Sequence, residues 1–476
     1  MFGVKLLGAL AGYLFTYLIT TSYGAETFGV FELCLTFMTI FGVLGRLGLD
    51  GALVRFIPEY KEKKEWGNMQ AAYKHALKVA LPVSTALAVI LFFTSDFLAG
   101  LFESSHLSLG LKITAVIAVL YLFLVSIGMV GTAFKGMGRD FAETLFESNA
   151  SAFIGLFIGI LATGLIQSSS TTTSLVVGMV AAGTFGDDPT LAVAAAVPYI
   201  MGANIGTSIT NTIVSLGHIV HKEEFKRAFA ASVVHDFFNI FAVIVIFPLE
   251  LIFGVISRSA MWLSSVFIGA DALTFKSPIK LITAPTVKWI DNLFQQQEYF
   301  DPYILLLIVA LSFLFFSLRN LTKLIRSLVM LRLENFFDTH IFKTAIRAMF
   351  FGAIITILVQ SSSITTSLVI PLAGAGILQL RQIFPYTLGA NIGTTVTSFL
   401  ASMVSGTIAP LSVALAHLLF NLFGIGLLWP IESIRDIPAK LSERFAARAV
   451  ENKLYPILYI LIVFFIIPLT LISIVG

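Results

Sequence analysis

Charge is scarce in this sequence. Only 12% of its 476 residues are Asp, Glu, Lys or Arg, whereas an ordinary soluble domain holds about 25%. Hydrophobic residues account for 57% of the chain, and the mean hydropathy is +0.93. A soluble fold would have to expose much of this apolar surface to water, which soluble proteins avoid. The composition therefore excludes a soluble enzyme and indicates a membrane protein.

Cysteine, continuous basic faces and nucleotide-binding loops are also rare or missing. Cys34, the single cysteine, lies in an apolar run, so the chain can form neither an internal disulfide nor a cysteine-based metal cage. The 30 Lys and Arg residues fall into short separate loops, which argues against nucleic acid as a partner. No Gly-Lys-Ser/Thr loop for ATP phosphates occurs. We expect no enzyme activity, no catalytic residues and no cofactor, with ion gradients as the energy source.

Long apolar windows are abundant. A helix needs about 20 mostly apolar residues to cross the hydrocarbon of a bilayer. Such windows lie at about 6–23, 27–46, 76–100, 113–132, 226–254, 302–318, 409–431 and 454–475. Four more are apolar but rich in Ser, Thr, Gln, Asn and Gly, at about 150–183, 192–217, 345–376 and 384–406. Because unpaired polar groups are costly in hydrocarbon, we expect these four to line a wet cavity of an all-α membrane protein.

Basic residues in the connections indicate the topology, because cytoplasmic loops carry an excess of Lys and Arg. Residues 319–332 and 435–453 are strongly basic, and Lys222, Lys226 and Arg227 mark a third basic connection. With these three on the cytoplasmic side, the connection of about 256–301 is expected to be an extracytoplasmic loop.

Two parts of the chain repeat one another. Residues 163–183 read TGLIQSSSTTTSLVVGMVAAG, and residues 356–376 read TILVQSSSITTSLVIPLAGAG. A second shared block follows each, PYIMGANIGTSITNTIVSLG from Pro198 and PYTLGANIGTTVTSFLASM from Pro385. Each copy ends with a His and an Asn four residues apart, which are His235 with Asn239 and His417 with Asn421. Three blocks in one order indicate an internal duplication.

The number of crossings between the copies predicts their relative orientation. If each QSSS window is a re-entrant hairpin that returns to its own side, spans near 192, 226 and 302 separate the two copies. An odd number of spans gives opposite orientations across the bilayer. This is the inverted-repeat layout of secondary transporters, in which broken helices meet near the midplane around the substrate.

The QSSS strings carry groups that suit a phosphate ion. Hydroxyls and a Gln amide are neutral donors and acceptors, and a helix that starts within the string adds unpaired N–H groups and the favourable end of its dipole. The substrate-binding candidates are Gln167, Ser168, Ser169, Ser170 and Thr171 in the first copy and Gln360, Ser361, Ser362 and Ser363 in the second.

Oxygen-bearing side chains in the second block suit sodium, because hard cations take carbonyl, hydroxyl and amide oxygens as ligands. The sodium-binding candidates are Asn204, Thr207, Ser208, Asn391, Thr394 and Thr395. Sodium is the only metal ion that we expect. The glycines of the two GANIGT strings permit a helix break or a close backbone approach, and these are Gly202, Gly206, Gly389 and Gly393.

Structural explanations compete with each of these functional ones. Ser and Thr in membrane helices commonly bond to a carbonyl one turn earlier or pack between helices, and the glycines can serve helix packing alone. His235 and His417 can make interhelical hydrogen bonds. Asp236, an acid in an apolar run, is either functional or paired with a loop lysine. Glu250 lies near a helix end, where its carboxylate can reach water.

The paired QSSS strings, the paired GANIGT strings and the His-Asp-Phe-Phe-Asn run at 235–239 resemble the type II sodium-dependent phosphate cotransporter family over residues 107–476. The resemblance implies sodium-coupled uptake of inorganic phosphate, with Gln167 to Thr171 and Gln360 to Ser363 at the substrate site and sodium as the coupling ion. Residues 256–301 lack the cysteines of the animal members, which suggests a prokaryotic relative in the cell inner (cytoplasmic) membrane.

The amino-terminal part differs from the rest. The run GRLGLDGALVRFIPEYKEKKE at 45–65 resembles the amino-terminal portion of the polysaccharide flippase family. We therefore expect four parts: an appended transmembrane segment at 1–106, a first transport repeat at 107–255, the extracytoplasmic loop at 256–301, and a second, inverted repeat at 302–476.

The sequence thus favours a multi-pass secondary active transporter in the lipid bilayer. It would work by alternating access, in which a fixed substrate site opens to one side of the membrane and then to the other. Its predicted substrates are inorganic phosphate and sodium. Two other interpretations remain open. The amino-terminal resemblance favours a lipid-linked oligosaccharide or polysaccharide flippase, and the polar hairpins are also compatible with an anion channel.

Overall fold

A computed structural model describes residues 105–146, 151–268, 277–295, 301–333 and 341–475, together with scattered positions between 29 and 102. All the regular elements in these ranges are helices, which confirms the predicted all-α class. The chain divides into two compact units, Met1–Tyr121 and Leu122–Gly476. The predicted span at 6–23 and most of the flippase-like segment lie outside the described residues.

The first unit has a small apolar core. Leu91, Ala99, Leu107 and Leu111 are buried together, and Cys34 packs against them. Lys112 makes an ion pair with Asp96 at 2.7 Å.

The second unit contains the three repeated blocks. Helix α5 (Ser105–Phe146) crosses the boundary between the units. The helices that follow are α6 (Ala152–Ile166), α7 (Ser169–Ala182), α8 (Pro189–Gly206), α9 (Ile209–Ser215), η1 (Leu216–His218), α10 (Lys222–Phe253), α11 (Val255–Ile268), α12 (Pro278–Phe294), α13 (Pro302–Leu333), η2 (Ile341–Lys343), α14 (Ala345–Val359), α15 (Ser362–Ser367), α16 (Val369–Gly374), α17 (Leu380–Ser402), α18 (Ile408–Leu428), α19 (Glu432–Glu451), α20 (Leu454–Leu461), the π-helix η3 (Ile462–Ile466) and α21 (Ile467–Val475).

Several helices are long and apolar enough to cross a membrane. Within the described residues these spans are Gly110–Met137, Pro189–His218, Lys222–Phe253, Ile408–Leu428 and Leu454–Ile474. Each falls on a window that the hydropathy pattern predicts. The expected span at 302–318 is a shorter apolar stretch of α13. The helices and their exposed apolar side chains make the chain a multi-pass membrane protein.

The segment 256–301, expected as a loop, is helical over much of its length. Helix α11 packs along α18, and the hydroxyl of Ser412 donates to Ser264 at 2.8 Å. Among its buried residues, Ile256, Ala260 and Ser264 are spaced four apart, which is the spacing of one helix face. Packing of that face against α18 stabilises α11.

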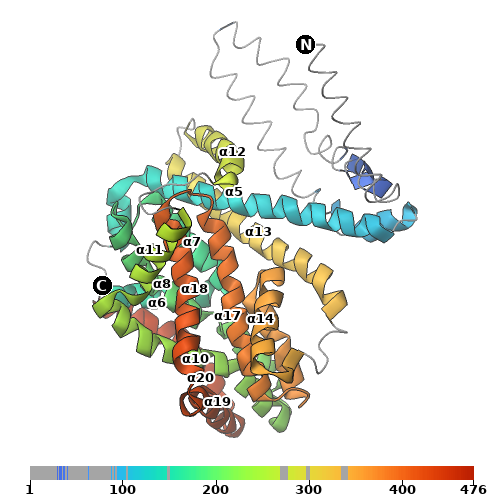
Figure 1. The fold of residues 1–476 in the computed structure, drawn as a ribbon, viewed down its shortest axis with the longest axis vertical. Coiled ribbons are helices and arrows are strands. Elements are labelled where there is room, and N and C mark those ends of the chain that lie inside the picture. The colour runs from blue at the N-terminus through green and yellow to red at the C-terminus, as the bar shows by residue number, and fades with distance from the viewer. Residues whose placement is uncertain are drawn as a thin grey trace. The chain divides into compact units, whose positions relative to one another are not determined.

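Two helix pairs are built alike. Helix α6 packs along α8 in the first copy, and α14 packs along α17 in the second, as Figure 1 shows for α14 and α17. A Cβ on Gly202 would collide with the carbonyl oxygen of Leu156, and a Cβ on Gly389 would collide with that of Met349. Both collisions involve equivalent positions of the repeat. The packing role of these glycines is confirmed.

The helix break expected at the GANIGT strings occurs in one copy only. Helix α8 ends at Gly206 and α9 begins at Ile209, so that the helix is interrupted at Thr207 and Ser208. In the second copy, α17 continues without interruption from Leu380 to Ser402. The shared string therefore permits a break but does not impose one.

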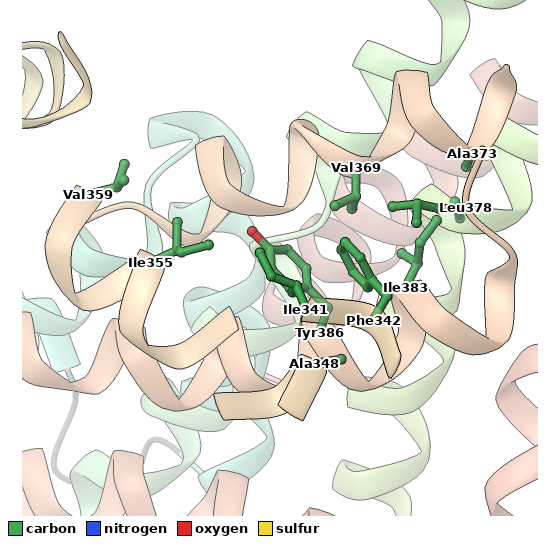
Figure 2. Close-up of a cluster of buried hydrophobic side chains, with 11 residues drawn as sticks. Ile341, Phe342, Ala348, Ile355, Val359, Val369, Ala373, Leu378, Ile383 and Tyr386 are labelled. Atoms are coloured by element: carbon green, nitrogen blue, oxygen red, sulfur yellow. The ribbon is translucent and has the colours of Figure 1, made fainter. Parts of the chain in front are cut away.

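A buried apolar cluster holds the second copy together. Its members come from α10, η2, α14, α16, α17 and the turn before α17, and are Ala231, Ile341, Phe342, Ala348, Ile355, Val359, Val369, Ala373, Leu378, Ile383 and Tyr386. Figure 2 shows Tyr386 and Phe342 at its centre, with ring centroids 5.6 Å apart. The Tyr386 hydroxyl donates to the carbonyl oxygen of Thr365 at 3.3 Å. The cluster therefore fixes α15 against α17.

Candidate functional site

Each QSSS string forms a sharp turn between two helices. Gln167 ends α6 with φ 56°, and Gln360 ends α14 with φ 55°. Among the described residues they are the only non-glycine residues with positive φ, a conformation that is uncommon for such side chains. We call residues 167–171 the first elbow and residues 360–364 the second elbow. The matched geometry makes the elbows a feature of the repeat.

The second helix of each elbow begins inside the polar string. The Ser168 hydroxyl accepts from the N–H of Thr171 at 3.2 Å and caps α7. The Ser361 hydroxyl accepts from the N–H of Ile364 at 3.4 Å and caps α15. The first N–H groups of a helix have no partner within it and form a site of positive potential. Both elbows therefore present groups that can bind an anion.

The substrate-binding candidates differ in burial. Ser169, Ser170, Thr171 and Ser362 are buried. Ser168, Gln360, Ser361 and Ser363 are half-buried, and Gln167 is exposed. Each elbow thus combines a buried part with a tip that reaches the surface.

Equivalent hydrogen bonds join each elbow helix to the other copy. Ser398 on α17 donates to the Thr173 hydroxyl on α7 at 2.8 Å. Thr366 on α15 donates to the side-chain oxygen of Asn211 on α9 at 2.9 Å. Thr173 and Thr366 are equivalent in the repeat, as are Asn211 and Ser398. The contacts therefore join the two copies through equivalent positions of the repeat.

Asparagines from four helices meet between the copies. Asn391 on α17 donates to the side chain of Asn239 on α10 at 2.9 Å, and Asn204 on α8 donates to the side chain of Asn421 on α18 at 3.3 Å. Asn239 also donates to the carbonyl oxygen of Asn204 at 2.8 Å. All four side chains are buried. This asparagine cluster again links each copy to the other through equivalent residues.

Both histidines make the expected interhelical hydrogen bonds. His235 Nε2 lies 2.6 Å from the side-chain oxygen of Asn391, and His417 Nδ1 lies 3.2 Å from the Ser398 hydroxyl. Because the Asn391 oxygen can only accept, Nε2 of His235 carries the proton. Within the described residues, His235 Nδ1 and His417 Nε2 are buried without a hydrogen-bond partner. Each ring therefore keeps one nitrogen for a ligand or water.

Four of the six sodium-binding candidates bond to a backbone carbonyl three or four residues earlier in the chain. The hydroxyls of Thr207, Ser208, Thr394 and Thr395 donate to the carbonyl oxygens of Ala203, Ile205, Ala390 and Ile392, at 2.8–3.1 Å. The back-bonding expected as the structural explanation is confirmed for these four. A hydroxyl that has donated its proton still has lone pairs. Back-bonding is therefore compatible with coordination of a cation.

The structure also identifies partners that sequence reasoning missed. Asn211 and Ser398 occupy equivalent positions in the second blocks of the two copies. Because one is Asn and the other is Ser, a search for identical residues in the two copies does not find them. Asp236 is buried and accepts a hydrogen bond from the Tyr459 hydroxyl at 2.9 Å, so that its partner is a tyrosine rather than a loop lysine. No local signal connects residues so far apart in the chain.

Glu250 corrects a further expectation. Its side chain is buried rather than extended into water, and it accepts from the N–H groups of Ile256 at 2.6 Å and of Ser257. The carboxylate caps the start of α11, where unpaired N–H groups favour negative charge.

Basic side chains line cavities at both ends of α17. A cavity of about 700 Å³ lies where α17 begins, and its basic residues are Lys226, Arg227, Arg381 and Arg444. A second cavity of about 400 Å³ lies past the end of α17, and its basic residues are Lys135, Lys280 and Lys288. At 1.5 Å per residue the helix between them is about 34 Å long. Acidic residues, including Glu223 and Asp291, are fewer in each cavity.

The chain is similar in sequence to known proteins. The family model described as Na+/Pi-cotransporter matches residues 122–274 and 313–433, which contain both copies of the repeat. Residues 1–121 lie outside the matched ranges, so the flippase-like interpretation of the amino-terminal part stays a prediction. No solved structure matches the chain.

Relatives of known name are similar over much of the chain. Sodium-dependent phosphate transport protein 2A of Rattus norvegicus is 31% identical over 431 residues, covering 75% of this chain and 67% of the relative. The 2A protein of Ovis aries is 32% identical over 436 residues, with the same coverage. Protein 2B of Homo sapiens is 31% identical over 451 residues, covering 75% of this chain and 64% of the relative. Because the family model matches both copies of the repeat and these relatives are similar over three quarters of the chain, the chain belongs to the Na+/Pi-cotransporter family.

Proposed function

We propose that the protein is a secondary active transporter that carries inorganic phosphate across the cytoplasmic membrane together with sodium. The observation that carries the proposal is the pair of capped helix starts at the elbows, each hydrogen-bonded through its helix to the other copy. The names of the relatives, sodium-dependent phosphate transport proteins, agree with this substrate and coupling ion.

The phosphate is bound by neutral donors in this proposal. Its oxygens accept from the N–H groups at the starts of α7 and α15 and from the hydroxyls and amides of the elbows. The binding residues are Gln167, Ser168, Ser169, Ser170, Thr171, Gln360, Ser361, Ser362 and Ser363. Hydrogen bonds to a charged acceptor are stronger than those between neutral groups, which supports capture of an anion by these groups.

The absence of charged side chains in the repeated blocks supplies the reason for coupling. Residues 163–183, 198–217, 356–376 and 385–403 contain no Lys, Arg, Asp or Glu. Burial of a phosphate anion without a counter-charge is strongly unfavourable. Sodium ions that bind beside the phosphate provide that counter-charge, so that anion and cation bind together.

Sodium is held by oxygens of the second blocks in this proposal. The ligands come from Asn204, Thr207, Ser208, Asn391, Thr394 and Thr395, together with backbone carbonyls at the interruption after Gly206. Carbonyl, amide and hydroxyl oxygens are suitable ligands for a hard cation.

Access alternates between the two sides of the membrane. The elbows are re-entrant hairpins of inverted repeats, and the basic cavities at the two ends of α17 are the vestibules of the two sides. Basic walls raise the local concentration of an anion. The cavity beside α10 and α19 is assigned to the cytoplasm, because these helices carry the basic connections.

Uptake of radiolabelled phosphate into proteoliposomes tests the function. We expect accumulation against a phosphate gradient when sodium is high outside, and a return to background when choline replaces sodium. Phosphate flux that does not depend on the sodium gradient would contradict symport. A flux per protein far higher than a transporter that moves one phosphate per conformational cycle can reach would favour a channel. Complete absence of phosphate uptake by correctly inserted protein would remove the proposal.

A further inference from the structure

The two elbows share their backbone geometry but not their side-chain contacts. In both copies the N–H of the elbow glutamine donates to a threonine carbonyl one turn earlier, at 2.7 Å. In the second copy the Gln360 side-chain oxygen also accepts from the Thr397 hydroxyl at 2.8 Å, and its amide donates to the Ile357 carbonyl at 2.6 Å. Gln360 is thus tied to α17.

The equivalent hydrogen bond is absent in the first copy. Thr210 on α9 is equivalent to Thr397, yet its hydroxyl is buried without a hydrogen-bond partner among the described residues. Gln167, which is equivalent to Gln360, is exposed, and its side chain makes no hydrogen bond there. A buried hydroxyl without a partner is unfavourable. The first copy therefore has a donor and an acceptor of the same type as the second, but they are not joined.

The helices beside the two threonines also differ. Thr397 lies within the continuous helix α17, whereas Thr210 follows the interruption at Thr207 and Ser208 between α8 and α9. The copies thus show two conformations of one structural unit, latched with an unbroken helix and unlatched with a broken one. Since the sequences at these positions match, each copy has the residues to adopt either conformation.

We propose that Thr397 and Thr210 are positioning residues that latch the two elbows in turn. In the state described, Gln360 is latched and Gln167 is free. In the opposite state, Gln167 accepts from Thr210, the first helix becomes continuous, and Gln360 is released. The inference rests on the proposed function, because exchange of the two latches is what exchanges the open side of an alternating-access transporter.

Spin-label distances measure this exchange directly. Cys34 is the only cysteine, so Cys34→Ser provides a background without native thiols. Labels at introduced cysteines replacing Leu165 and Ile213 report the first elbow, and labels replacing Leu358 and Phe399 report the second. These four side chains are 37–65% exposed, so that labels fit without disturbing the core. Each pair joins an elbow to the helix of its threonine.

Two valine substitutions are expected to shift the distances in opposite directions. Thr397→Val removes the hydroxyl but keeps the shape, so the 358–399 distance lengthens and the 165–213 distance shortens. Thr210→Val destabilises the other state and gives the reverse change. Each shifts the ratio of the two populations by about fivefold, the factor expected for one typical hydrogen bond. The double variant returns the ratio close to its original value.

Matched controls separate a latch from a purely structural role. Thr397→Ser keeps the hydroxyl and is expected to retain the original ratio. Thr387→Val alters a buried threonine of α17 that bonds only to the Phe384 carbonyl, and is expected to leave both distances unchanged. If each valine variant alters only the distance at its own elbow, or both shift the ratio in one direction, the latch proposal is overturned.

Uptake measured on the same preparations keeps the two proposals distinct. Opposite distance shifts without any phosphate uptake would retain the latch and remove the assigned function. Sodium-dependent phosphate uptake, with label distances that are unchanged in Thr397→Val and Thr210→Val, would support the function and contradict the latch.

Discussion

Ser398 donates a hydrogen bond to Thr173 at 2.8 Å, across 225 positions of the chain. Thr366 and Asn211, which are equivalent to Thr173 and Ser398, are also joined by a hydrogen bond, which Thr366 donates at 2.9 Å. Each elbow helix is thus attached to the second block of the opposite copy. Each copy therefore supplies hydrogen-bond partners to the polar interior of the other.

The elbow glutamines are expected to be essential for transport. Gln360→Ala or Gln167→Ala removes a substrate-binding amide, and we expect phosphate uptake to fall at least about tenfold, the effect of losing a hydrogen bond to a charged group. Thermal stability should change little for Gln167→Ala, because the Gln167 side chain is exposed, whereas Gln360→Ala also removes the hydrogen bond with Thr397 and should lower it modestly. Gln295→Ala, at the exposed end of α12, is the matched control. Unchanged uptake in both elbow variants would disprove the site assignment.

The asparagine cluster is expected to be a major source of stability. Asn391→Ala leaves His235 and Asn239 without their partner, and unsatisfied buried polar groups cost about 1–3 kcal/mol each. We therefore expect a clear loss in apparent melting temperature of the purified protein. Asn320→Ala removes only a bond to the Phe316 carbonyl within one helix and serves as the control. Equal stability of the two variants would refute this role.

Close helix packing predicts a strong effect at two glycines. Gly202→Ala and Gly389→Ala place a methyl group against a backbone carbonyl that cannot move without its helix. Overpacking of this kind costs about 1–3 kcal/mol, so we expect poor recovery of folded protein by size-exclusion chromatography. Gly426→Ala meets no atom within 4 Å and is expected to be neutral or slightly stabilising. Normal recovery of Gly202→Ala would contradict the packing described here.

The basic cavity past the end of α17 is expected to attract phosphate electrostatically. Combining Lys280→Gln with Lys288→Gln should lower the rate of phosphate capture several-fold at low ionic strength. The difference should shrink as choline chloride is added, because about 0.1 M salt screens charges beyond about 10 Å. The pair Lys280→Arg and Lys288→Arg keeps the charge and should behave as the unmodified protein. A salt-independent defect would instead indicate a structural role.

Local features of the fold were predictable because they depend on neighbours in the chain. Helix starts within the polar strings follow from Ser168 and Ser361, whose hydroxyls cap N–H groups three residues away. Apolar windows likewise predict the long helices. The partners of Glu250 could not be predicted in this way, since they belong to the next helix and depend on the turn at Gly254.

Amino-acid sequence alone determined the all-helical class, the duplication and the polar composition of the elbows, because these are properties of short segments. Only the tertiary structure decided which residues meet, as with Asp236 and Tyr459 or Asn204 and Asn421. It also decided that one copy is latched and the other is not, although their glutamines and threonines are the same. Similar local sequences can differ in this way because packing against distant helices selects between the conformations that the local interactions permit.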